Sequence, residues 1–150
     1  MNPELLPDLH SFRHHCDLQI RFSDVDVLGH VNNTVYMTFY DTGKAHYFTD
    51  IIGKVIDWKH VETVIANVDC AFLAPIFFGE EIEVLTRCLH IGEKSFKLLQ
   101  AIREKKSGVI KSACETVMVA FDDKTGKAME LPSDWREALE KDMQCCRPEG

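Results

Sequence analysis

The sequence has no apolar run that approaches the roughly 18 to 20 residues needed to cross a bilayer. Residues 1–13 carry acidic residues and prolines instead of the basic start and apolar stretch of a secretory signal. Both absences predict a cytoplasmic protein that does not interact with a membrane.

Basic residues are in the minority, with 17 Lys and Arg against 24 Asp and Glu and a formal net charge of −7. A general nucleic-acid-binding protein would present a basic face, so no nucleic-acid partner is expected. An acidic protein can still bind an anionic ligand, provided that basic side chains gather locally around it.

The six cysteines lack the spacing of a metal site or of a redox motif. There is no Cys-x-x-Cys pair and no histidine at zinc-finger spacing, so no metal ion is expected. Cys70, Cys88 and Cys114 lie in apolar, strand-like runs, where a reduced cysteine behaves as a small hydrophobic residue. Without a secretion signal, a disulfide scaffold is not expected either.

The chain has the length of one domain, and no repeat or low-complexity linker divides it. We therefore predict a single domain over residues 1–150, with a lead segment at 1–15 and a C-terminal helix at 132–143. Residues 16–23 alternate between apolar and polar side chains, a pattern that predicts a β-strand.

A long apolar helix is predicted next. Apolar side chains and one glycine recur at spacings of three and four residues, namely Tyr36, Phe39, Tyr40, Gly43 and Tyr47. Asn32 or Asn33 is a suitable N-cap, since its side-chain oxygen can accept a hydrogen bond from a free backbone N–H. Gly53 is a suitable C-terminal stop.

From residue 61 onward the sequence predicts β-structure. Strand-like runs at 61–74, 81–91, 95–103 and 109–121 are separated by turn sequences. Several runs are apolar on both alternations, so one face should pack on the helix and the other should be partly covered. We predict an α+β fold in which a curved antiparallel sheet of about five strands wraps one long central helix.

The densest polar cluster lies directly before the helix. It reads Asp24-Val25-Asp26-Val27-Leu28-Gly29-His30-Val31-Asn32-Asn33. Such residues also build ordinary turns and caps. However, four Asp and Asn residues exceed the needs of one cap, and a carboxylate at the entrance of a buried helix is costly to desolvate without a partner.

This segment resembles the signature of the 4-hydroxybenzoyl-CoA thioesterase family of hotdog-fold acyl-CoA thioesterases. The family pattern is approximately Asp-x-Asp-x-x-Gly-His-Val-Asn-Asn, with a Tyr three residues further on, here Tyr36. The resemblance continues through Pro75, the Gly79-Glu80 corner, the turn at 92–96 and Pro132, over about residues 16–140. It implies the hotdog fold, which agrees with the order of elements inferred above.

The resemblance places the catalytic carboxylate at Asp26. A carboxylate in this place can attack the thioester carbonyl or activate a water molecule. The N–H groups at the start of the helix, around residues 31–34, are expected to stabilise the oxyanion together with the positive end of the helix dipole.

His30 and Asn33 complete the set of catalytic candidates. An imidazole can transfer protons near neutral pH, although His30 can equally hold the loop by hydrogen bonding. Asn33 stands where a related branch of the family carries a catalytic His; its amide can position water or substrate but does not relay a proton. Asp26 is therefore the strongest acid–base candidate, and Asp24 is expected to be a turn residue or a partner of Arg21.

The substrate implied by the resemblance is a small-molecule acyl-CoA thioester, so coenzyme A is part of the substrate and no separate cofactor is expected. The expected substrate-binding residues are Val31, Asn32, Tyr36, Gly92, Lys94 and Ser95. The last three form a turn suited to the nucleotide end of coenzyme A, although solvated charges at a strand edge are the alternative.

Three functions remain open at this point. The first is acyl-CoA hydrolysis. The second is a hotdog dehydratase or hydratase, which needs a His and an acidic partner, and the third is a non-catalytic acyl-CoA-binding module. The resemblance also implies a homodimer or homotetramer whose subunits share the active site.

Overall fold

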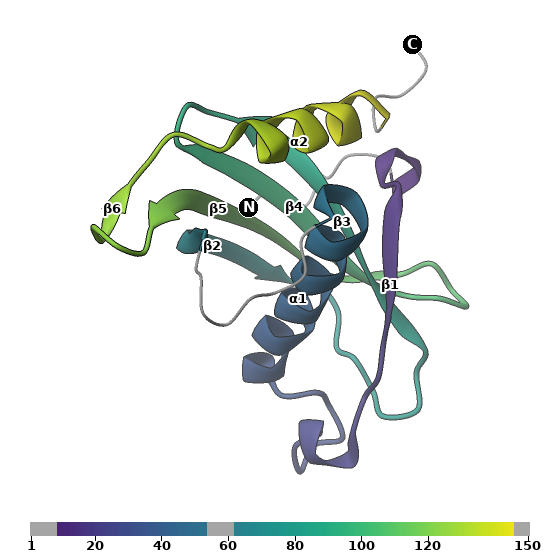
Figure 1. Cartoon of the computed structure of the whole chain (residues 1–150). Helices are drawn as coiled ribbons and strands as arrows, with labels where there is room; N and C mark the ends of the chain where they lie inside the picture. The colour runs from purple at the N-terminus through teal and green to yellow at the C-terminus, as the bar shows by residue number, and fades with distance from the viewer. Residues whose placement is uncertain (1–8, 54–61, 146–150) are drawn as a thin grey trace.

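A curved antiparallel sheet wraps one long helix in the computed structural model, which describes residues 9–53 and 62–145 (Figure 1). The strands are β1 (His14–Leu18), β2 (Thr63–Phe72), β3 (Ile82–Ile91), β4 (Ser95–Glu104), β5 (Ile110–Asp122) and β6 (Lys127–Ala128). The sheet order is β1-β3-β4-β5-β2, and the short β6 pairs with β5. The predicted α+β class and hotdog fold are confirmed.

The central helix α1 (Asn33–Tyr47) continues into a π-helical turn, Phe48–Ile52. Asn32 caps its start, because the Asn32 Oδ1 accepts a hydrogen bond from the Thr34 N–H at 3.0 Å. The turn ends at Gly53, whose φ of 75° lies in the left-handed region that glycine adopts without strain. The predicted N-cap and stop are confirmed.

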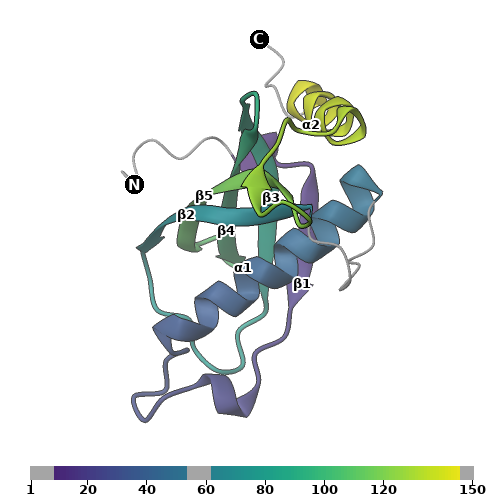
Figure 2. The ribbon, with the colours of Figure 1, turned by 60° about the vertical axis from the view of Figure 1, so that its left-hand side comes forward.

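The apolar face of α1 packs against the sheet as predicted (Figure 2). The buried residues of α1 are Tyr36, Phe39, Tyr40, Gly43, Lys44 and Tyr47. A Cβ at Gly43 would lie 2.8 Å from Val84 Cγ1 and 2.9 Å from Gln100 Nε2, so glycine permits the close approach of helix and sheet. Gln100 Nε2 also donates to the Tyr40 carbonyl at 3.1 Å.

The second helix, α2 (Ser133–Cys145), closes one end of the sheet. Its buried Trp135 and Leu139 join the apolar cluster around Tyr47. Asp142, with no exposed surface, accepts hydrogen bonds from the Tyr47 hydroxyl at 2.6 Å and the Cys88 N–H at 3.4 Å. This end of α1 is therefore sealed by both apolar and polar contacts.

The predicted strands match the observed ones closely, with one main difference. The strand expected over 16–23 ends at Leu18, because Phe22–Asp24 forms a 3-10 turn instead. The predicted first residue of the strand at 61 lies outside the described residues. Part of the lead segment covers the outer face of the sheet, where Phe12 packs on Leu85 and Leu99.

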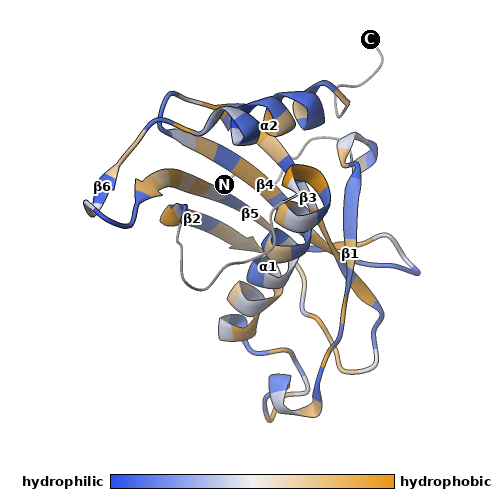
Figure 3. Ribbon diagram, in the orientation of Figure 1, coloured by the Kyte–Doolittle hydropathy of each residue, from blue (hydrophilic) through white to orange (hydrophobic). Residues whose placement is uncertain are grey.

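Hydropathy follows this layering (Figure 3), with apolar colour concentrated on the long strands and polar colour on much of α2. In the parts of the chain that the structure describes, neither helix is both long enough and apolar enough to cross a membrane.

Candidate active site

The polar cluster forms a tight loop between β1 and α1, and Asp26 holds it closed. The Gly29 N–H donates to the Asp26 carbonyl at 3.0 Å, and the Asp26 N–H donates to the His30 carbonyl at 2.9 Å. The Asp26 carboxylate uses Oδ1 to accept from the Leu28 N–H at 2.9 Å. The side chain is exposed, and Oδ2 has no protein partner among the described residues.

Asp24 has a different environment, although it stands only two positions away. It is buried, its Oδ2 accepts from the Arg21 N–H at 2.8 Å, and the Arg21 guanidinium lies 3.6 Å from Oδ1. These contacts confirm the predicted structural role of Asp24 as the partner of Arg21.

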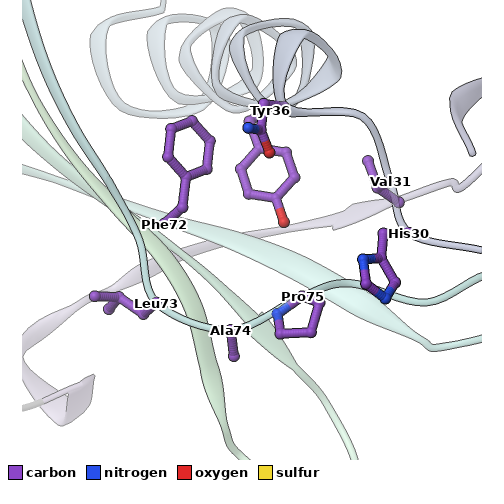
Figure 4. Close-up of a pocket in the computed structure, with 8 residues that line it drawn as sticks. His30, Val31, Tyr36, Phe72, Leu73, Ala74 and Pro75 are labelled. Carbon is purple, nitrogen blue, oxygen red and sulfur yellow. The ribbon is translucent and has the colours of Figure 1, made fainter. Parts of the chain in front are cut away.

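A cavity of about 250 Å³ opens beside this loop, at the start of α1 (Figure 4). It is lined by His30, Val31, Asn33, Tyr36, Phe72, Leu73, Ala74 and Pro75. The first turn of α1 and the end of the loop form one side. The last residue of β2 and the segment that follows it form the other side.

Tyr36 adds a buried polar group to the cavity, which His30 and Asn33 also line. Its side chain is only 2 % exposed, and Figure 4 shows the hydroxyl pointing into the cavity toward Pro75. Burial raises the pKa of Tyr36, while a hydrogen bond from the Ile76 backbone acts in the opposite direction. The ring lies 5.0 Å from that of Phe72, centroid to centroid. Tyr36 is therefore a neutral hydrogen-bonding group at physiological pH.

The structure brings most, but not all, of the expected site residues together. His30 and Asn33 line the cavity, as do Val31 and Tyr36, whereas Asp26 is not among the lining residues. Asp26 is joined to the lining residue His30 by hydrogen bonds within the loop.

Sequence reasoning missed the opposite wall of the cavity, at residues 72–75. The sequence did carry a signal there, since the apolar strand ends at a proline and proline does not continue a sheet. What the sequence lacked was any indication that this strand end faces the start of α1.

Most of the backbone N–H groups that were expected to donate to the oxyanion already donate to acceptors within the protein. The Val31 N–H donates to the Ile76 carbonyl at 2.8 Å, and the Asn32 N–H donates to a loop carbonyl at 2.9 Å. The Thr34 N–H donates to the Asn32 side chain. These three amides therefore have acceptors within the protein, and the Asn33 N–H is the remaining candidate of the four.

The turn expected to bind the nucleotide end of coenzyme A lies far from Asp26 in the same chain. The Gly92 N–H donates to the Ser95 carbonyl at 2.7 Å, and Arg136 of α2 donates to the Gly92 carbonyl at 2.8 Å. Figures 1 and 2 place α2 and the Asp26 loop at opposite ends of the molecule. A ten-residue β3 separates the ends by about 30 Å, so Gly92, Lys94 and Ser95 do not meet Asp26 within one chain.

Within the described ranges, no three His, Cys, Asp or Glu side chains gather in a way that could hold a metal ion.

The thioesterase-like superfamily matches residues 20–139, which include both the loop and the cavity. The chain belongs to this superfamily, and the predicted family resemblance is thereby confirmed.

Individual relatives agree with this assignment. The chain is 24 % identical to the long-chain acyl-CoA thioesterase FadM of Escherichia coli (strain K12) over 127 residues, covering 83 % of this chain and 95 % of FadM. The crystal structure of a thioesterase from Thermus thermophilus, complexed with coenzyme A and Zn, matches with a TM-score of 0.78 and 28 % identity, covering 92 % of this chain and 98 % of that one. The PA5185 protein of Pseudomonas aeruginosa PAO1 matches with a TM-score of 0.77 and 26 % identity, covering 87 % and 92 %.

Proposed function

We propose that the chain hydrolyses acyl-CoA thioesters to the free acid and coenzyme A, with Asp26 as nucleophile or general base. The observation that carries this proposal is an exposed carboxylate, with one oxygen uncommitted, on the loop that contributes His30 and Val31 to the cavity. The similarity to an acyl-CoA thioesterase and to a thioesterase bound to coenzyme A supports the substrate class.

Each part of the site fits one requirement of thioester hydrolysis. The apolar walls at Val31, Phe72 and Pro75 suit the first part of an acyl group. Asp26, on the adjoining loop, would attack the thioester carbonyl or activate water. The Asn33 N–H, at the positive end of α1, would donate to the oxyanion.

A homodimer would complete this site. Among the described strands, β2 pairs only with β5, which leaves its other edge open. Apolar side chains of β2 remain exposed, with Ile65 at 46 %, Val68 at 39 % and Phe72 at 49 %. An open apolar edge is a site for pairing with another strand, and β2 of a second copy is the occupant that we propose.

Antiparallel pairing of the two β2 strands would also explain the distant turn at 92–95. Ser95 lies in register with Val119 of β5, and Val119 with Val64 of β2, so the turn lies at the same end of the sheet as the start of β2, with β5 between them. In an antiparallel pair, the start of one β2 lies beside the end of the other, where Phe72 borders the cavity. The turn of the second copy would then lie near this cavity and could contact coenzyme A. Light scattering at micromolar protein should give a dimer or a tetramer, and a monomer would contradict this arrangement.

The catalytic proposal is tested by release of free thiol from a panel of acyl-CoA thioesters. Asp26→Asn should lower turnover by at least ~10²-fold, because it removes the charge and basicity of the carboxylate. Asp17→Asn is the matched control, since Asp17 is an exposed carboxylate on β1 that forms a surface ion pair with Lys105 and does not line the cavity. Turnover unchanged by Asp26→Asn would overturn the assignment.

The position of His30 in the cavity keeps the hydratase alternative testable. Hydration of an unsaturated acyl-CoA is measured as a loss of its absorbance. We expect no such loss under conditions in which thiol release is detected. Tight acyl-CoA binding with neither reaction would instead support a non-catalytic binding module.

A further inference from the structure

Two thiols face one another beneath the central helix. Cys70 of β2 and Cys114 of β5 are direct cross-strand partners, and both belong to the cluster that packs against Tyr40 of α1. Cys70 is half-buried and Cys114 is buried, and both are free cysteines.

The type of pairing suits a disulfide between them. The Leu73 N–H donates to the Lys111 carbonyl at 2.9 Å, which marks a hydrogen-bonded pair of positions. Hydrogen-bonded and non-hydrogen-bonded pairs alternate along an antiparallel ladder. Cys70 and Cys114 stand three positions from Leu73 and Lys111, so they form a non-hydrogen-bonded pair, whose Cα atoms lie about 4.5 Å apart. A disulfide spans Cα separations of roughly 4.4 to 6.8 Å, so little backbone movement is needed.

A hydroxyl group lies within reach of the Cys70 sulfur. Ser112 Oγ is 3.6 Å from Cys70 Sγ. The Ser112 hydroxyl accepts from the Tyr40 hydroxyl at 2.6 Å and donates to the Ala71 carbonyl at 2.8 Å. Because a hydroxyl proton rotates freely about its C–O bond, Ser112 can turn its proton toward a Cys70 thiolate while Tyr40 still donates to the oxygen.

The charges around the pair distinguish the two sulfur atoms. A hydrogen bond from Cys114 lowers the pKa of Cys70, with smaller contributions from Ser112 and from the ammonium of the buried Lys44 that oppose burial and the nearby Asp69. The same hydrogen bond, together with burial, raises the pKa of Cys114. Cys70 is also the less buried of the two and the one beside Ser112, so we assign it as the nucleophile.

We propose that Cys70 and Cys114 form an oxidisable dithiol that reacts with a hydroperoxide to give a cross-strand disulfide. The Cys70 thiolate attacks the peroxide, so an S–O bond forms, the O–O bond breaks, and hydroxide or alkoxide leaves. The departing hydroxide or alkoxide takes the proton of Cys114, whose thiolate attacks the sulfenic acid of Cys70; an S–S bond forms, the S–O bond breaks and hydroxide departs. The two sulfur atoms together lose two electrons, which the peroxide gains.

This site lies beside the proposed active site but does not depend on it. Phe72, which borders the cavity, follows Cys70 by two positions and shares its face of β2. The disulfide would bind β2 covalently to β5 and so fix the strand that carries this wall. Oxidation is measured by mass and not by turnover, so failure of either proposal leaves the other standing.

The test is hydrogen peroxide treatment of the full chain, followed by blocking of free thiols, intact-mass measurement and peptide mapping. Relative to the reduced chain, and apart from the blocking groups, the wild type should lose the mass of two hydrogen atoms. Peptide mapping should place the disulfide between Cys70 and Cys114, and dithiothreitol should reverse it. Cys70→Ser should abolish this product. Cys114→Ser, which keeps a hydroxyl able to donate to Cys70, should leave a sulfenic acid on Cys70 that dimedone traps. Cys16→Ser is the matched control and should retain the disulfide, because Cys16 is also half-buried but lies on β1.

Relative thiol reactivity provides a second measurement that needs no variant. Burial raises the pKa of Cys16, so iodoacetamide at neutral pH should label Cys70 at least ~10-fold faster than Cys16. Equal labelling of the two, or a disulfide mapped to any other pair of cysteines, would overturn the proposal.

Discussion

The two ends of the central helix hold a carboxylate each, and the two carboxylates have opposite environments. At the start of α1, Asp26 is exposed and keeps Oδ2 without a protein partner in the described chain. At the other end, Asp142 is fully buried and accepts from Tyr47 and Cys88. The first carboxylate is available to a substrate, whereas the second is committed to the fold. We therefore expect substitutions at the start of α1 to change activity and substitutions at its other end to change stability.

The largest expected effect is at Asp26, where a substitution should lower activity without lowering stability. Asp26→Asn should cost at least ~10²-fold in turnover yet leave the thermal midpoint nearly unchanged. The reason is that the asparagine Oδ1 can still accept from the Leu28 N–H. Thiol release measures the turnover, and thermal unfolding of the same preparation measures the thermal midpoint. A fall in both would show that Asp26 serves the loop instead of the chemistry.

The reverse pattern is expected at Asp142. Asp142→Ala leaves the Tyr47 hydroxyl and the Cys88 N–H without their acceptor, and each such buried group costs about 1–3 kcal/mol. Urea unfolding should therefore show a loss of about 2–6 kcal/mol, which includes loss of the ion pair between Arg13 and Asp142, with turnover per folded molecule unchanged. Asp142→Asn, which keeps one acceptor oxygen, is the matched control and should lose less. A large loss of turnover in folded protein would contradict the assignment of this end to stability.

The middle of the helix should respond through packing alone. Gly43→Ala places a methyl group 2.8 Å from Val84 Cγ1, and overpacking of this kind costs about 1–3 kcal/mol. Unfolding measurements should show this loss. The exposed His46→Ala on the same helix should change stability by less than about 0.5 kcal/mol. If the two substitutions change the free energy of unfolding equally, the close contact of α1 with the sheet at Gly43 does not contribute to stability.

The smallest expected effects are at the adjacent asparagines, which we expect to have different roles. Asn32→Ala removes the N-cap and should cost about 1 kcal/mol of stability, with turnover retained, because Asn32 does not line the cavity. Asn33→Ala keeps the backbone N–H but removes a side-chain amide from the cavity wall, so it should lower turnover without a comparable loss of stability. A drop in turnover for Asn32→Ala at full folding would restore Asn32 as a substrate contact.

Local features of the fold were predictable because each depends on neighbours in sequence. The face of α1, the Asn32 cap, the Gly53 stop and the order of the long strands all follow from periodicity or turn chemistry. The bond between Tyr47 and Asp142 joins residues 95 positions apart. No local pattern encodes such a pairing, so a charged residue in α2 gave no sign of being buried.

The candidate site shows the same limit. The motif located Asp26 and His30 on one loop, but backbone polarity alone does not reveal which amides are already paired. The Val31 and Asn32 N–H groups turned out to donate to backbone carbonyls of the protein itself. Likewise, the turn at 92–95 was recognisable from its residues, while its distance from Asp26 depends on the length and direction of β3.

The contact of Phe12 with Leu85 and Leu99 has a practical consequence for preparing this protein. Shortening the N-terminus is a common way to improve crystals, and the lead segment invites it. A cut beyond Phe12 would uncover two leucines in the middle of the sheet and remove the Ser11 hydroxyl to which Arg87 donates at 2.8 Å. The exposed apolar surface would favour aggregation, so trimming should stop ahead of Ser11.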